Sequence, residues 1–382
     1  MFEKITAREL ADRRDSGIDN SVLVDTRPEE SYEAWRIEGA ENVPFGPGET
    51  LSDDQRAEID ALANGNRIVT VCGKGATSTR LASELDANGF EDVAVLTGGM
   101  RAWNSLYETA RVDTTDDLVA IQFQRRAKGC LSYLVGSKRA GEAVVVDPTR
   151  HTDQYVTTAA EEGLAITRVL DTHIHADHIS GGHALAARLG VPYHLGERAT
   201  GRDLGYEFES LADGETVPVG DIEIEVLPAP GHTSEMVNYR IGDEAVLTGD
   251  ALFLDSVGRT ELEFGDEEAE RGARMQYETL HGTLLELPDE LAVLPGHVTI
   301  HDDGAYENAS PGELVGASLD NVRDRLDLLD LDEAAFVERM VENVPEKPDN
   351  YETIIGINRG EESVETDRDA TMLETGANNC AA

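Results

Sequence analysis

The sequence predicts an α/β protein built from two domains. Its 382 residues suit two or three domains at the usual size of about 150 residues each. Over the first hundred residues, short apolar runs alternate with helical patterns, which indicates a parallel sheet covered by helices. After a polar stretch, a second series of apolar runs follows, and several of them end on histidine or aspartate. We therefore expect a smaller α/β domain first and a larger, metal-binding domain second.

The first domain is predicted from its alternating pattern. Thr6 to Ala11 starts like a capped helix, and residues 21–25 read as a short buried strand. Further strands are expected over 67–72 and 93–96, helices over 32–37, 53–62 and 79–85, and a loop or edge strand over 40–45. The strand over 67–72 ends on Cys72, at the sheet edge where parallel α/β folds usually place their chemistry.

Cys72 is the candidate nucleophile of this domain. The loop after it contains two glycines, so its backbone can curl and turn several N–H groups toward the sulfur. The N-terminus of the following helix and the charge of Lys74 also stabilise an anion. These features are expected to lower the pKa of the thiol and to favour the thiolate. The alternative is a small apolar cysteine that closes a strand.

This region resembles a rhodanese domain. The resemblance lies in Val24 to Arg27, Gly39 to Pro44, Cys72 with its six-residue loop, and Leu96 to Gly99 before Trp103. It implies an α/β sulfurtransferase domain over residues 1–108, in which Cys72 accepts a sulfane sulfur and carries it as a persulfide. The implied substrate-binding loop consists of Gly73, Lys74, Gly75, Ala76, Thr77 and Ser78.

The second domain is placed over residues 118–382, because residues 108–117 are polar and lack apolar periodicity. Strands are expected over 118–123, 130–136, 143–146, 166–170, 222–227, 245–248 and 291–294, and helices over 154–162, 183–189, 317–329 and 331–344. Between the strand over 166–170 and the following helix lies Asp171-Thr172-His173-Ile174-His175-Ala176-Asp177-His178. Imidazole and carboxylate together suit Zn, Fe or Mn. The alternative is a polar loop that happens to be rich in histidine.

Three later strands deliver the same kinds of ligand. His232, Asp250 and His297 each follow an apolar run, so a sheet whose strand ends converge would bring them to His173. The series THIHADH, GHT, GD and PGH resembles the ligand series of the metallo-β-lactamase superfamily. The resemblance implies an αββα sandwich, with two mixed sheets packed face to face and helices outside. One metal position would use His173, His175, His232 and Asp250, and a second would use Asp177, His178, Asp250 and His297.

Further motifs are similar to the persulfide dioxygenase (ETHE-type, glyoxalase-II-like) branch. They are Gly129 to Leu134, Gly258-Arg259-Thr260, and a C-terminal helix over 331–344 followed by Pro345-Glu346-Lys347-Pro348. That branch implies one Fe(II) per chain, held by His173, His232 and Asp250, with His175, Asp177, His178 and His297 orienting these ligands. Two histidines and one carboxylate leave open positions for substrate and O₂ on iron. Arg259 is the candidate contact for the carboxylates of the thiol carrier.

The charge is strongly negative, since 76 acidic residues stand against 32 basic ones for a net charge of −44. The acid is spread along the chain, which we interpret as halophilic adaptation of a cytoplasmic protein; the competing interpretation is an acidic surface for a basic partner. Nucleic acid is a poor partner, because its phosphates would be repelled. The three cysteines, 72, 130 and 380, lie too far apart for a disulfide framework, and neither a signal peptide nor a membrane span is expected.

These resemblances therefore imply an enzyme of sulfur metabolism. Its iron site would oxidise a low-molecular-weight thiol persulfide with O₂ to sulfite, and Cys72 would exchange sulfur among persulfide, sulfite and thiosulfate. One alternative is a glyoxalase-II-like thioester hydrolase with two Zn ions and an appended rhodanese sulfur-carrier module. Another is a sulfur carrier or scaffold with a non-catalytic rhodanese module. The identity of the thiol, the direction of sulfur transfer and the formation of a homo-oligomer stay open.

Overall fold

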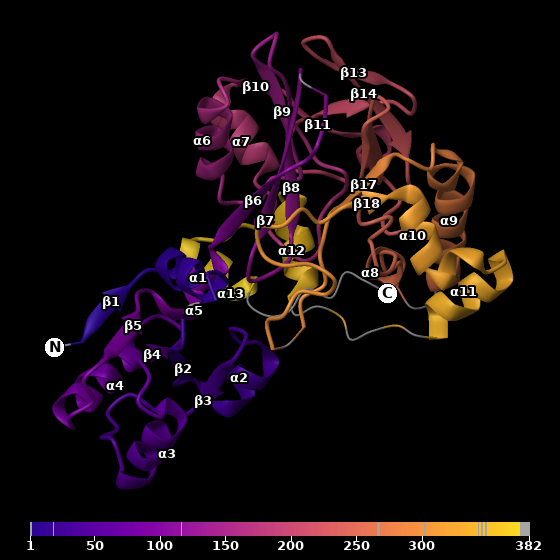
Figure 1. The fold of residues 1–382 in the computed structure, drawn as a ribbon. Coiled ribbons are helices and arrows are strands. Elements are labelled where there is room, and N and C mark those ends of the chain that lie inside the picture. The colour runs from indigo at the N-terminus through magenta and orange to yellow at the C-terminus, as the bar shows by residue number, and fades with distance from the viewer. Residues whose placement is uncertain are drawn as a thin grey trace. The chain divides into compact units, whose positions relative to one another are not determined.

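The computed structural model describes residues 2–17, 19–115, 117–265, 268–301, 303–342, 344, 347 and 350–374. Cys380 and, apart from Lys347, the predicted motif over 345–348 lie outside the described residues. The chain divides into two compact units. The first unit comprises the chain up to Tyr107 together with two later segments, Arg125–Lys128 and Ile300–Glu307. The second unit begins at Glu108 and comprises the other stretches. Figure 1 labels the elements of both units.

The first unit is built on a five-stranded sheet in the order β1-β5-β4-β2-β3. Every neighbouring pair in it is parallel. The strands are β1 (Glu3–Ile5), β2 (Val22–Asp25), β3 (Ala40–Asn42), β4 (Ile68–Val71) and β5 (Val93–Leu96). β4 lies in the middle of the sheet, so the residue that follows it, Cys72, is presented at the carboxyl edge.

Helices cover both faces of this sheet, as expected for a parallel sheet. They are α1 (Ala7–Asp15), α2 (Glu29–Ala34), α3 (Asp53–Ala63), α4 (Ala76–Ala87) and α5 (Gly99–Asn104). α3 and α4 bury Ile59 and Leu81 in one apolar cluster, while α1 and α5 bury Leu10 and Trp103 in another. A capping box starts α1, because the Thr6 side chain accepts from the Glu9 N–H and the Glu9 side chain accepts from the Thr6 N–H.

The helix expected over 32–37 lies three residues earlier. α2 is preceded by Pro28, whose φ of −53° is the value that the proline ring imposes. It ends at Ala34, since Trp35 is extended and 2 % exposed, with its side chain in the apolar cluster of α1 and α5. Burial of a large aromatic side chain thus overrides the helical pattern.

The second unit contains a seven-stranded sheet in the order β12-β11-β10-β9-β8-β7-β6. Its strands are β6 (Tyr107–Arg111), β7 (Leu118–Arg125), β8 (Leu131–Ser137), β9 (Glu142–Val146), β10 (Ala165–Leu170), β11 (Tyr193–Gly196) and β12 (Glu209–Leu211). β7, β8 and β9 pair antiparallel, whereas β9, β10, β11 and β12 pair parallel. β6 lies in the stretch expected to be an unstructured boundary. It is an edge strand in which Ala110 alone is buried, so it carries no apolar run.

A six-stranded sheet in the order β13-β14-β15-β16-β17-β18 completes the second unit. Its strands are β13 (Thr216–Val219), β14 (Ile222–Pro228), β15 (Val237–Ile241), β16 (Ala245–Gly249), β17 (Ala292–Pro295) and β18 (Ala317–Ser318). β16 and β17 are parallel, and the other pairs are antiparallel. Both sheets of the second unit are therefore mixed, as the predicted sandwich requires.

Helices lie outside both sheets (Figure 1). They are α6 (Asp153–Glu161), α7 (Gly182–Leu189), α8 (Glu261–Phe264), α9 (Ala269–Gly282), α10 (Leu319–Arg325), α11 (Glu333–Glu342), α12 (Tyr351–Asn358) and α13 (Asp367–Leu373), with short 3-10 turns over Glu197–Gly201, Leu284–Glu286 and Asp327–Asp330. α6 and α7 contact β10 of the seven-stranded sheet, and α10 contacts β17 of the six-stranded sheet. The predicted fold class, a rhodanese-like α/β domain and an αββα sandwich, is confirmed.

Candidate metal centre and thiol loop

The strand ends of the second unit converge on the predicted ligands. β10 ends at Leu170, and residues 171–181 after it form the segment that we call the His loop. β16 ends directly before Asp250, and its parallel neighbour β17 ends two residues before His297. His232 lies between β14 and β15. The candidate ligands from four separate stretches of sequence therefore lie at or near the ends of strands.

The structure gathers His173, His232 and Asp250 into one buried cluster whose ligand atoms all lie within 4.8 Å of one another. Asp250 Oδ2 lies 3.8 Å from His173 Nε2 and 3.6 Å from His232 Nε2. Among the described residues, His173 Nε2 and Asp250 Oδ2 have no hydrogen-bond partner, although both are buried. Unpaired buried polar atoms are costly. Two imidazoles and a carboxylate that face one point therefore fit a metal ion.

Each histidine of this cluster is held through its other ring nitrogen. His173 Nδ1 lies 2.9 Å from Thr172 Oγ1, and His232 Nδ1 donates to the Arg259 carbonyl at 2.6 Å. The Thr172 hydroxyl in turn donates to the buried carboxylate of Asp147 at 3.0 Å. Such contacts fix the ring orientation and leave Nε2 facing the cluster.

The electrostatics of the cluster favour neutral imidazole beside carboxylate. Burial lowers the pKa of His173 well below its ordinary value, and the neighbouring His175 lowers it further. Burial raises the pKa of Asp250, but the contacts with His297, His173 and His232 outweigh it and hold that pKa below the usual range. These are the protonation states in which both side chains can bind a metal.

The other predicted ligands are divided between two further buried clusters. His175 Nε2 lies 3.3 Å from Asp147 Oδ1, and these residues form a group with Asp171. Asp177, His178 and His297 form the other group, in which His297 Nε2 is 3.0 Å from Asp177 Oδ2. His297 also reaches the first cluster, since its Nδ1 is 2.7 Å from Asp250 Oδ1. His175 is thus turned toward Asp147, and His297 links two buried carboxylates.

Cys130 belongs to the group of Asp177, His178 and His297, which the sequence did not indicate. We expected Cys130 to pack within a strand, but it directly precedes β8, and its backbone forms an isolated antiparallel β-bridge with that of His297. Its Sγ lies 3.3 Å from Asp177 Oδ2. Burial and Asp177 raise the pKa of Cys130, but contacts with His178 and His297 outweigh them and lower it to about 7.

Arg259 requires a correction. We expected its guanidinium to receive carboxylates of the thiol carrier, but the side chain is 0 % exposed and already paired with Glu261, whose Oε1 lies 2.5 Å from Arg259 Nε. Its backbone carbonyl instead accepts from His232. Gly258, directly before Arg259, lets the backbone of this segment lie close to that of Asp250, because a Cβ on residue 258 would lie 1.8 Å from the Asp250 carbonyl oxygen. The segment supports His232 and does not offer a free cation.

In the first unit, the Cys72 loop curls around the sulfur as expected. Cys72 is 4 % exposed, and its Sγ accepts from the Gly75 N–H at 3.0 Å and from the Ser78 hydroxyl at 3.3 Å. Gly75 has a φ of 88°, a conformation that glycine adopts without strain. Burial raises the pKa of the thiol, but the hydrogen bonds of Ser78, Thr77 and the loop amides outweigh it, so the pKa lies below its ordinary value. Lys74 contributes through its backbone N–H, which also lowers the pKa of Cys72.

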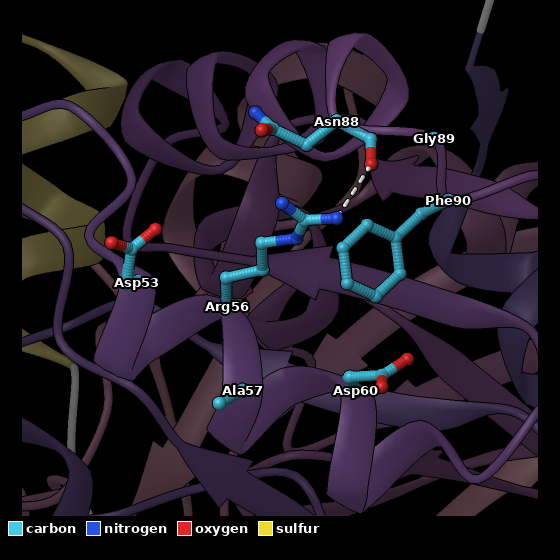
Figure 2. A pocket seen from close by; sticks show the side chains of 7 residues that line it. All are labelled: Asp53, Arg56, Ala57, Asp60, Asn88, Gly89 and Phe90. Carbon is cyan, nitrogen blue, oxygen red and sulfur yellow. Dashed lines mark hydrogen bonds between the residues drawn. The ribbon is translucent and has the colours of Figure 1, made fainter.

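A hollow on the surface of the first unit holds none of these residues. Figure 2 shows it between α3 and the chain after α4, where the Arg56 guanidinium points to the Asn88 carbonyl at 3.4 Å. Asp53, Asp60 and Phe90 also line it, but no cysteine or histidine does. We therefore assign it no part in the chemistry.

Among the residues that the structure describes, every helix is too short or too polar to span a membrane.

The fold and the buried His-His-Asp cluster define a metal-binding sandwich protein with a thiol-bearing α/β domain. Family models agree with this class: the rhodanese-like domain model matches residues 6–106, and the metallo-β-lactamase superfamily model matches residues 125–297. The chain belongs to the metallo-β-lactamase superfamily and carries a rhodanese-like domain. The predicted fusion of these two domains is thus confirmed.

Relatives include two kinds of enzyme. The mitochondrial persulfide dioxygenase ETHE1 of Bos taurus is 31 % identical over 173 residues, which cover 44 % of this chain and 65 % of that protein. The chain thus spans slightly less than two thirds of the bovine protein. A hydroxyacylglutathione hydrolase of Polaromonas sp. is 30 % identical over 239 residues, which cover 57 % of this chain and 88 % of that protein.

Solved structures give the same picture. A metallo-β-lactamase from Staphylococcus aureus is 26 % identical with a TM-score of 0.58, and the match covers 66 % of this chain and 75 % of that one. ETHE1 from Myxococcus xanthus is 28 % identical with a TM-score of 0.54, and the match covers 64 % of this chain and 99 % of that one.

Proposed function

We propose that this chain is a persulfide dioxygenase with an appended rhodanese-type sulfurtransferase. The observation that carries the proposal is the cluster of His173, His232 and Asp250, in which two imidazole rings and one carboxylate face one point, whereas His175 is grouped with Asp147 and Asp171. That set of ligands leaves open positions on Fe(II) for a substrate and O₂. The similarity to ETHE1 proteins over the second unit supports the same reaction.

The proposed oxidation consumes a persulfide, O₂ and water: RSS⁻ + O₂ + H₂O gives RSH, SO₃²⁻ and H⁺. The outer sulfur is oxidised to sulfite, O₂ is reduced, and the S–S bond breaks. One Fe(II), held by His173, His232 and Asp250, would supply the sites at which persulfide and O₂ meet. The chain's own residues orient the site, because Thr172, the Arg259 carbonyl and His297 fix its three ligands.

Cys72 is the proposed site of sulfur transfer. Its persulfide would give the outer sulfur to sulfite, so that SO₃²⁻ and the Cys72 persulfide yield S₂O₃²⁻ and the Cys72 thiolate; the reverse reaction consumes thiosulfate. The contacts from Gly75 and Ser78 to Sγ support this role, since they stabilise negative charge on sulfur. Gly73, Lys74, Ala76 and Thr77 complete the proposed substrate loop. The sulfite made in one domain is thus the substrate of the other.

We assign residues 1–108 to the sulfurtransferase and residues 118–382 to the dioxygenase with its C-terminal helical extension. We also propose that the protein works in the cytoplasm of a halophile, because a net charge of −44 is best tolerated where salt screens it. Its partners would be a low-molecular-weight thiol persulfide, O₂, sulfite and thiosulfate.

A thioester hydrolase with two metal ions is the second candidate. The chain covers 88 % of the Polaromonas hydroxyacylglutathione hydrolase, and Asp177, His178 and His297 lie together as a second cluster beside the first. Two metal ions would activate water for hydrolysis. The His175 ring, which the first position of such a site would use, faces Asp147 in this structure.

Ligand variants test the proposal. His232→Ala and Asp250→Ala should lose both bound iron and persulfide-dependent oxygen uptake, measured by metal analysis and an oxygen electrode. His281→Ala is the matched control, because His281 lies on α9, outside the three clusters. Variants of His232 or Asp250 that consume oxygen at the wild-type rate would sink the proposal.

A further inference from the structure

We infer that Asn358, the last residue of α12, is a positioning residue that holds the His loop in the geometry needed for metal binding. The inference rests on the proposed metal position at His173, but not on the reaction that follows. The Asn358 side chain bonds to backbone atoms of His175, His178 and Ser180. It acts through the backbone of the loop.

Asn358 is 7 % exposed, and both the nitrogen and the oxygen of its side-chain amide form hydrogen bonds with the His loop. Nδ2 donates to the carbonyls of His175 and His178, both at 2.8 Å. Oδ1 accepts from the Ser180 N–H at 2.9 Å. The loop has no regular secondary structure, so these buried backbone groups depend on side chains for their hydrogen bonds. A single amide thus fixes three points of the loop.

Arg359, directly after α12, also supports the N-terminal part of the His loop, through Arg202 and Glu235. The Arg359 carbonyl accepts from the Gly205 N–H at 2.7 Å, and Arg359 Nε donates to the Arg202 carbonyl at 2.9 Å. The Arg202 side chain pairs with Glu235. Glu235, which is 1 % exposed, accepts from the Ile174 N–H at 3.0 Å, between His173 and His175.

The last helix, α13, leads to a second support. Glu374 directly follows α13 and is 0 % exposed. Its Oε1 accepts from the Ile179 N–H at 2.9 Å, and its Oε2 lies 2.8 Å from Arg150 Nε. Arg150 also donates to Thr371 of α13 at 2.8 Å. The tail after α11 therefore binds the His loop directly at His175, His178, Ile179 and Ser180. It reaches Ile174 only through Arg202 and Glu235.

Loss of Asn358 is expected to loosen the ligand geometry. Two buried carbonyls and one N–H of the loop would lose their partner and turn toward other groups, which displaces the backbone that carries His173. Groups that orient metal ligands from outside typically change metal affinity 10- to 100-fold when they are removed. The effect should appear in metal release before it appears in the fold.

Two variants and one control test this role. Asn358→Asp keeps the shape but replaces two donors by a carboxylate that faces two carbonyl oxygens, and Asn358→Ser keeps one donor. Val322→Ala, in the apolar cluster of α9 to α11, is the control for lost stability away from the loop. The readouts are the rate at which Fe(II) passes to a chromogenic chelator without oxygen, and hydrogen exchange of the peptide over 171–182.

We expect Asn358→Asp to release Fe(II) about 10- to 100-fold faster than wild type, Asn358→Ser less so, and Val322→Ala at the wild-type rate with unchanged exchange in the loop. Release at the wild-type rate in Asn358→Asp overturns the inference. So does failure of both Asn358 variants to fold with Fe(II) present, because Asn358 would then serve the fold. A wild-type protein that binds Fe(II) tightly but takes up no oxygen contradicts the proposed function alone.

Discussion

Replacing His297 by alanine should destabilise the second unit far more than removal of an exposed histidine. His297 Nδ1 lies 2.7 Å from Asp250 and Nε2 lies 3.0 Å from Asp177, and both carboxylates are 1 % exposed or less. These carboxylates raise the pKa of His297 well above its ordinary value, against the lowering effect of burial. In the metal-free protein His297→Ala therefore removes the nearest partner of Asp250 and leaves Asp177 with His178, whose Nδ1 lies 2.9 Å from Asp177 Oδ1; breaking such a buried pair costs about 3–5 kcal/mol.

The assay is urea or thermal unfolding of the metal-free protein. For a unit of this size, about 3–5 kcal/mol corresponds to a fall in Tm of roughly 6–20 °C. His183→Ala is the control within the second unit: His183 lies exposed on α7 and stacks on Tyr206, with ring centroids 4.7 Å apart, so we expect a loss of about 1 kcal/mol or less. Equal losses in the two variants would refute the assignment of His297 as the link between two buried carboxylates.

Three further predictions concern salt, the independence of the two sites and the thiol. Lowering the salt from about 1 M to about 0.01 M lengthens the Debye length from ~3 to ~30 Å, so a chain of charge −44 should melt at a lower temperature; a flat or rising Tm contradicts this. Cys72→Ser should abolish sulfur transfer to thiosulfate and leave oxygen uptake intact, whereas Asp250→Ala should abolish oxygen uptake and leave sulfur transfer to added sulfite intact. Equal thiosulfate from wild type and Cys72→Ser at equal oxygen uptake would exclude the rhodanese-like domain as the transfer site. Ser78 donates to the Cys72 sulfur, so Ser78→Ala should raise the pKa of the thiol and move its pH profile of alkylation to higher pH. An unchanged profile would remove Ser78 from the thiolate's support.

The fold class and the main candidate ligands were predictable because their signals are local. β4 and β16 are buried, mostly apolar strands, and each ends directly before a candidate site residue, Cys72 or Asp250. The capping box at Thr6 starts α1 within one residue of the expected position. Such patterns depend on neighbours in sequence, so they survive without knowledge of tertiary contacts.

The remaining features depend on contacts between distant residues. Asn358 binds the carbonyl of His175, 183 positions away, and nothing in its own neighbourhood marks it. Arg259 reads as a free cation until Glu261 is seen to neutralise it. Cys130 reads as a strand residue until the bridge to His297 places its sulfur beside Asp177. Polar groups buried by the tertiary fold leave no periodic pattern in the sequence.

The central claim is that one iron, held by His173, His232 and Asp250, oxidises a persulfide. Anaerobic purification followed by metal analysis and an oxygen-electrode assay on a thiol persulfide tests it most directly, at molar salt so that the fold is kept. We expect one Fe(II) per chain and one O₂ consumed for each sulfite formed. Two zinc ions per chain, hydrolysis of a glutathione thioester and no oxygen consumption would contradict the claim and establish the hydrolase instead.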